Sequence, residues 1–116
     1  MSVAIYSRDL MGISTIDGAA KAAGQTTVSV ADIGDFVARV PADVQWIFVD
    51  LGAVTGSLAE FTNALRSHAP YAKIVAYGPH VHENLLAEAS AAGCDKVMTR
   101  GQFMRSLPVL FGTGSV

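Results

Sequence analysis

Apolar residues in this chain gather in five short runs, at positions 3–6, 26–30, 44–49, 72–77 and 96–99. Most of these runs are nearly continuous in Val, Ile, Ala and Phe and do not alternate with polar residues. Strands that are covered on both faces have this pattern, as in parallel sheets that lie between helices. We therefore predict five buried strands.

Apolar residues recur at helical spacing between these runs. They define four helical stripes: Ile13, Ile16, Ala20 and Ala23; Ile33, Phe36, Val37 and Val40; Leu58, Phe61 and Leu65; and Leu85, Leu86, Ala89 and Ala92. Asp32 is the expected N-cap of the second helix, Ser57 begins a capping box with Glu60, and Gly93 is the expected C-cap of the fourth helix. This alternation predicts right-handed crossovers and a doubly wound α/β domain with a five-stranded parallel sheet.

The last helix is expected to be short. The segment 103–111 is mostly apolar, but it contains Pro108, and proline is tolerated in a first turn rather than in a helix interior. We expect this helix to start near Ser106, the domain to cover residues 1–111, and residues 112–116 to form a flexible tail.

A short last helix would leave apolar side chains near the C-terminus uncovered. Exposed apolar area usually marks an interface, and a two-fold dimer is the commonest way to bury it. This predicts a homodimer with Leu107, Leu110 and Phe111 in its interface. The alternative is a longer native chain that covers the same surface itself.

Composition fits one small domain. Of the 116 residues, 51% are hydrophobic and 16% are charged, which is enough apolar material for a covered core. The net charge of -2 and the scattered basic residues give no reason to expect nucleic-acid binding. We expect a cytoplasmic protein without a membrane partner, because neither a signal sequence nor a spanning apolar run is present. Cys94 is the only cysteine, so no internal disulfide is possible.

Asp50 is the first candidate for chemistry, because it follows the third apolar run directly. Ligands and reactive groups gather at the carboxyl ends of parallel strands. A carboxylate at this position could be a nucleophile, a metal ligand or a helix cap.

A second candidate is the pair His80 and His82, with Glu83 beside it, which could be half of a metal site. We interpret these residues as loop and helix-cap side chains, because no further ligand cluster has suitable spacing. The chain also contains no glycine-rich phosphate loop, no nucleophile elbow and no zinc-binding spacing. We predict no metal and no cofactor.

The chain resembles the receiver domains of two-component response regulators, whose fold is flavodoxin-like with five βα units. The resemblance covers nearly the whole chain. Asp50 matches the aspartate that receivers phosphorylate, and the segment 92–103 resembles the family's approach to its last strand and Lys-Pro-Phe turn. The resemblance implies a pocket around Asp50 formed by Ser7, Arg8, Asp9, Gly78, Thr99 and Arg100.

The motif residues of the family mostly fail to match. Its paired acidic residues hold Mg²⁺ after the first strand, but here those positions are Ser7 and Arg8, with Asp9 one place beyond. Its hydroxyl residue after the fourth strand is Gly78, and its lysine after the fifth strand is Arg100.

Other positions depart from the family as well. Gly101 stands in place of the proline of the family, and Val97 stands in place of its switch aromatic. Metal-assisted phosphotransfer needs the metal, the acceptor and the positive clamp together. We therefore expect a degenerate receiver, not an enzyme, that docks a protein partner. Arg8 and Arg100 would lie near Asp50, and one or both could pair with its carboxylate.

Two alternatives remain open at this stage. The chain could still accept a phosphoryl group on Asp50, which a Mg²⁺ titration would reveal. It could also be a small flavodoxin-like enzyme or ligand-binding domain, which a deep apolar pocket at the strand ends would favour.

Overall fold

One parallel sheet forms the centre of the computed structural model, which describes residues 2–112. Its strand order is β2-β1-β3-β4-β5. The strands are β1 (Ser2–Tyr6), β2 (Thr26–Val30), β3 (Trp46–Asp50), β4 (Lys73–Gly78) and β5 (Lys96–Thr99). The predicted five strands are confirmed. The third begins at Trp46 rather than Val44, because Val44 closes a turn by donating its N–H to the carbonyl of Pro41 at 3.1 Å.

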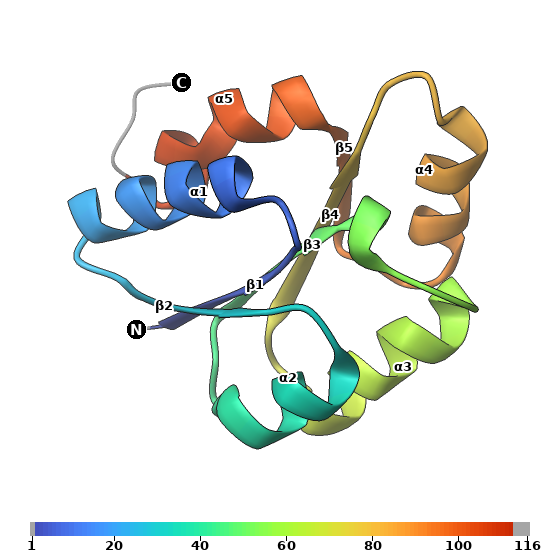
Figure 1. Cartoon of the computed structure of the whole chain (residues 1–116), viewed down its shortest axis with the longest axis horizontal. Helices are drawn as coiled ribbons and strands as arrows, with labels where there is room; N and C mark the ends of the chain where they lie inside the picture. The colour runs from blue at the N-terminus through green and yellow to red at the C-terminus, as the bar shows by residue number, and fades with distance from the viewer. Residues whose placement is uncertain (1, 113–116) are drawn as a thin grey trace.

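Helices cover both faces of this sheet (Figure 1). They are α1 (Leu10–Ala22), α2 (Ile33–Arg39), the 3₁₀ turn η1 (Leu51–Ala53), α3 (Leu58–His68), α4 (Glu83–Ala91) and α5 (Arg100–Leu110). Asp32 caps α2 as predicted, accepting from the N–H of Asp35 at 2.7 Å, and Ser57 accepts from the N–H of Glu60 at 3.2 Å, which is one of the two bonds of the predicted capping box. Gly93 follows α4 with a φ of 101°, a conformation that favours glycine.

The alternating strand residues divide the interior into two cores. On one face, α1 and α5 pack against side chains such as Phe48 and Tyr77. On the other face, α2, α3 and α4 pack against side chains such as Ile47 and Ala76. Because both faces are covered, the strands carry apolar residues at nearly every position. The doubly wound α/β fold is therefore confirmed.

The expectation of a short last helix is wrong. Helix α5 begins at Arg100, because Thr99 and Gln102 form a complete capping box there. Pro108 lies in the last turn, where its missing N–H removes a single backbone hydrogen bond. The helix therefore tolerates the proline at its C-terminal end instead of starting beside it.

The longer α5 also changes the surface expected near the C-terminus. Leu107 is only 1% exposed and belongs to the core, so its side chain is not available to a partner. Leu110 and Phe111 are half-buried, and the Phe111 ring contacts Phe48 at a centroid distance of 5.8 Å. The homodimer stays a prediction, and of its three interface residues only these two retain exposed surface. In the expected tail, residues 113–116 lie outside the described residues.

Helices α2 and α4 each bury a single residue, Phe36 in α2 and the much smaller Ala89 in α4. In α4, Leu85 and Leu86 are partly buried. None of the helices within residues 2–112 is long and apolar enough to cross a membrane.

Candidate functional site

The candidate site lies where the strand order reverses. The chain moves outward from β1 to β2, and then from β3 to β4 and β5 on the other side. This reversal leaves a crevice at the carboxyl ends of β1 and β3, where open α/β sheets bind ligands. Ser7 follows β1 directly, and Asp50 is the last residue of β3. The topology therefore places both residues at the reversal.

Both carboxylate oxygens of Asp50 accept hydrogen bonds from the protein. The hydroxyl of Ser7 donates to Oδ2 at 3.0 Å, and the backbone N–H of Gly52 donates to Oδ1 at 3.0 Å. The second bond makes Asp50 the N-cap of η1. Ser7 in turn accepts from the backbone N–H of Asp9 at 3.0 Å. Asp50 is thus held in place by its own neighbours.

The acidic residue beside Asp50 is bound to a cation from the same chain. Asp9 is the N-cap of α1, where Oδ1 accepts from the N–H of Met11 at 3.2 Å. Its Oδ2 accepts a hydrogen bond from Nη2 of Arg100, the first residue of α5. This bond lowers the pKa of the Asp9 carboxyl, and the same contact raises the pKa of Arg100. The ion pair joins the beginnings of α1 and α5, which lie next to each other in Figure 1.

The predicted pairing of an arginine with Asp50 does not occur within the described residues. Arg100 pairs with Asp9, whose Oδ1 caps α1 and whose Oδ2 accepts from the guanidinium. Arg8 turns outward and donates to the carbonyl of Ala31 at 3.5 Å. Of the six predicted pocket residues, Ser7, Asp9 and Arg100 form the network around Asp50, and Arg8 does not.

Gly78 and Thr99 are partners in the register of β4 and β5. Gly78 has no side-chain hydroxyl, and the Thr99 hydroxyl makes no described contact with Asp50. The Thr99 hydroxyl accepts from the N–H of Gln102 and caps α5. A Cβ added to Gly78 would meet Leu51 at 3.5 Å and Leu86 at 3.6 Å. The surroundings of Gly78 are therefore apolar.

Sequence reasoning missed two residues of this site. Tyr77 pairs in register with Asp50, and its fully buried ring stacks on Phe103 at a centroid distance of 4.3 Å. Burial, together with the negative charge of Asp50, raises the pKa of Tyr77 to about 12, so the phenol is neutral at physiological pH. The available signal was a tyrosine inside a strand that is otherwise aliphatic.

The second missed residue is Gly12, in the first turn of α1. A Cβ built there would lie 3.0 Å from Oδ2 of Asp9 and 3.2 Å from Nη2 of Arg100. The missing side chain therefore leaves the space in which the ion pair lies. A glycine in an expected helix was the only sequence signal.

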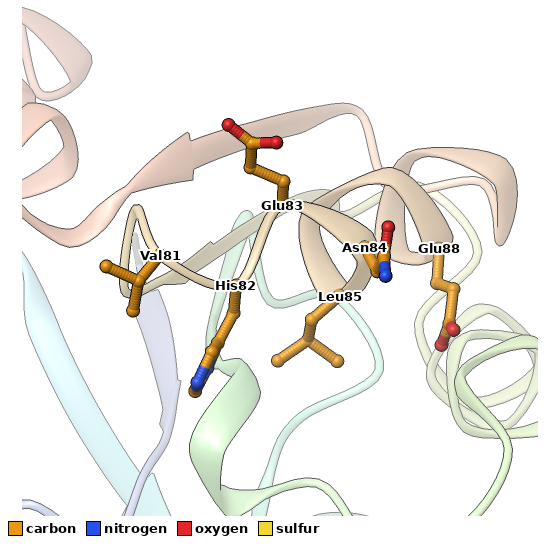
Figure 2. Close-up of a pocket in the computed structure, with 6 residues that line it drawn as sticks. All are labelled: Val81, His82, Glu83, Asn84, Leu85 and Glu88. Atoms are coloured by element: carbon orange, nitrogen blue, oxygen red, sulfur yellow. The ribbon is translucent and has the colours of Figure 1, made fainter.

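The two histidines lie one loop away from Asp50, at the start of α4. A hollow of about 500 Å³ is lined there by Val81, His82, Glu83, Asn84, Leu85 and Glu88 (Figure 2). The side chains of His82 and Leu85 point to one side of the first turn, and that of Glu83 points to the other (Figure 2). Among the described residues, no three His, Cys, Asp or Glu side chains come together as metal ligands would.

Comparison with known proteins finds similarity in structure only. No protein-family model matches the chain, and no curated protein matches its sequence. The chemotaxis response regulator CheY4 of Vibrio cholerae aligns with a TM-score of 0.77 and 17% identity, over 96% of this chain and 95% of that one. A two-component response regulator from Clostridium difficile aligns with a TM-score of 0.76 and 11% identity, over 97% of this chain and 96% of that one.

A third solved structure, the beryllofluoride-activated NtrC4 receiver domain dimer, aligns with a TM-score of 0.74 and 11% identity, over 96% of each chain. The similarity extends over almost the full length of all three structures. The chain therefore has the fold of response-regulator receiver domains, as the resemblance in sequence implies.

Proposed function

We propose that this chain is a signalling domain with a receiver fold that acts through protein contacts and does not use Mg²⁺-dependent phosphorylation of Asp50. The observation that carries the proposal is the ion pair between Asp9 and Arg100. In a receiver, the carboxylates after the first strand hold Mg²⁺. Here the carboxylate after the first strand is that of Asp9, and the guanidinium of Arg100 occupies it.

The residues present do not fit a divalent cation. Mg²⁺ needs several oxygen ligands in octahedral geometry, usually with one or two free carboxylates. Asp9 is already neutralised by Arg100, and both oxygens of Asp50 accept hydrogen bonds from Ser7 and Gly52. A metal would have to displace a positive charge that is tethered to the fold, and like charges repel.

The phosphoryl-binding hydroxyl is also missing from its usual place. Gly78 stands at the end of β4 with leucine side chains beside it. Without the metal and this hydroxyl, the site lacks most of the electrostatic stabilisation on which phosphoryl transfer depends. This arrangement favours a domain that a protein partner in the cytoplasm recognises in its unmodified form. In this proposal the domain is not itself an enzyme.

The first test is phosphorylation. Incubation with acetyl phosphate and Mg²⁺ should give no phosphoryl adduct by intact-mass measurement, while a receiver with a complete acidic cluster is labelled under the same conditions. A stoichiometric adduct that disappears in Asp50→Asn would overturn the proposal and favour a receiver that is still phosphorylated on Asp50.

The second test removes the tethered cation. Calorimetry at millimolar Mg²⁺ or Mn²⁺ should detect no saturable binding to the wild-type chain. In Arg100→Ala, Asp9 loses its partner and the repulsion disappears, so weak binding should become measurable and should be lost again in Arg100→Ala/Asp9→Asn. Equal binding by the wild type would contradict the assignment of Arg100 as the cation of this site.

A second copy of the chain is one candidate partner. The NtrC4 receiver domain with the same fold forms a dimer. In this chain, Leu110 and Phe111 remain half-exposed at the end of α5 and could contribute to such an interface.

A further inference from the structure

An aromatic and basic groove lies at the opposite end of the sheet from Asp50. Trp46, Lys73 and Lys96 are the first residues of β3, β4 and β5. Two hollows lie there, of about 450 and about 270 Å³, and Trp46 and Lys73 line both of them. We refer to these two neighbouring hollows together as the amino-edge groove.

Strand register explains why the three side chains come together. Trp46 pairs directly with Lys73, and Lys96 pairs with Val75. Side chains two positions apart on a strand share a face, so Lys73, Val75 and Lys96 lie on the same side of the sheet. Val75 belongs to the core under α1 and α5. The groove therefore begins where this core reaches the surface.

Two aromatic side chains, those of Trp46 and Tyr71, line the groove. The half-buried indole of Trp46 packs on Phe48 at a centroid distance of 5.7 Å, and the Nζ of Lys73 lies 5.8 Å from the indole. Tyr71 stands in the turn before β4 and is 95% exposed, the most exposed large hydrophobic side chain among residues 2–112. Burying such rings is a large source of binding free energy, and aromatic residues are enriched at the centres of protein interfaces.

The charges in the groove favour an acidic occupant. Lys73 and Lys96 are exposed and take part in none of the ion pairs between described residues. The neighbouring Asp95 is paired with Arg66: its Oδ2 accepts from Arg66 at 2.8 Å and from the N–H of Ile74 at 2.7 Å. Asp43 also lines the larger hollow, next to Val44 and Gln45 in the chain. Lys73 lies over the Trp46 ring and also interacts electrostatically with Asp95. Because neither lysine forms an ion pair within residues 2–112, both ammonium groups can still accept a carboxylate from a partner.

We propose that the amino-edge groove docks an acidic segment of a partner protein, with an apolar or aromatic side chain against Trp46 and Tyr71 and flanking carboxylates on Lys73 and Lys96. Peptide segments with this chemistry match both the rings and the lysines. A nucleic acid is disfavoured, because binding a phosphate backbone requires more cations than these two. The groove is remote from Asp50, so this inference stands independently of whether Asp50 is phosphorylated.

Trp46 is the only tryptophan of the chain, so its fluorescence reports directly on the groove. The probe is a capped pentapeptide with a central phenylalanine and two glutamates on each side. Titration should change Trp46 emission to saturation. A peptide with glutamine in place of glutamate should bind at least several-fold more weakly.

Variants locate the binding. Lys73→Gln/Lys96→Gln should raise the dissociation constant of the peptide by about threefold to tenfold, the range for the loss of two exposed ion pairs. Tyr71→Ser should also weaken it without disturbing the fold, because this ring is almost fully exposed. Lys21→Gln is the control: it removes one lysine charge, half of what the double variant removes, from an exposed site on α1 where Lys21 pairs with Asp17, and it should leave binding unchanged.

Three outcomes would overturn the proposal. The first is unchanged Trp46 emission at millimolar peptide, and the second is equal binding of the glutamine peptide. The third is tighter binding of an oligothymidylate of the same charge, which would identify a nucleic-acid surface instead.

Discussion

Phe103→Ala should lower the free energy of unfolding by about 3–5 kcal/mol, the usual cost of truncating a fully buried phenylalanine. Its ring is fully buried, stacks on Tyr77 with an interplanar angle of 5° and meets Phe48 edge-on at 5.1 Å. Truncation would remove both aromatic contacts and leave a cavity between α5 and the sheet. Since small domains have only about 5–15 kcal/mol of stability, this is a large fraction of the total.

Urea denaturation measures this loss, with Val109→Ala as the matched control on the same helix. Val109 is 44% exposed, so its truncation should cost far less. If Phe103→Ala does not fold, Phe103→Leu should still show an intermediate loss because it retains part of the buried volume. A loss from Phe103→Ala no larger than that from Val109→Ala would mean that α5 does not pack on the sheet as described.

Gly12→Ala is expected to have effects of opposite sign in two backgrounds. Alanine in place of a helical glycine normally stabilises by up to about 1 kcal/mol. In the wild type, however, the new Cβ would lie 3.2 Å from Nη2 of Arg100 and 3.0 Å from Oδ2 of Asp9, so the ion pair must move. The substitution should then be neutral or destabilising. In Arg100→Ala the guanidinium is gone, and Oδ2 of Asp9, no longer held by the ion pair, can move away from the new Cβ, so the same substitution should stabilise.

A double-mutant cycle by urea denaturation measures the difference, and contacting residues commonly couple by about 0.5–3 kcal/mol. Gly18→Ala is the control, because it lies in the same helix with no atom within 4 Å of its added Cβ. It should stabilise both backgrounds equally. If Gly12→Ala behaves as Gly18→Ala does, then Gly12 does not make room for Arg100.

The strands and most helices could be predicted from the sequence because burial on both faces leaves a strong local pattern. The runs 26–30 and 96–99 match β2 and β5 to the residue. The end of the chain was harder, because the same Pro108 is compatible with the first turn or the last turn of a helix. The capping box of Thr99 and Gln102 starts the helix at Arg100 and so places Pro108 in its last turn. Both capping residues are polar and lie outside the apolar pattern.

The site was predictable in its position but not in its pairing. Topology brings Ser7 to Asp50, and the sequence places both at strand ends. Arg100 pairs with Asp9, the N-cap of α1. That pairing could not be predicted, because the hydrophobic pattern does not say whether α1 begins after Arg8 or after Asp9. The space for that contact comes from the missing side chain of Gly12, which hydrophobic patterning does not reveal.

The sparse burial of α4 has a consequence for how the domain fluctuates. Local opening costs little free energy where few apolar contacts are lost, so weakly anchored elements detach while the rest of the fold remains native. Helix α4 contributes Ala89 alone to the buried core, whereas α3 contributes Leu58, Phe61 and Leu65. The backbone amides of α4 should therefore exchange with solvent deuterium through excursions that leave the sheet intact, so a binding protein could remodel α4 at a lower energetic cost than α3.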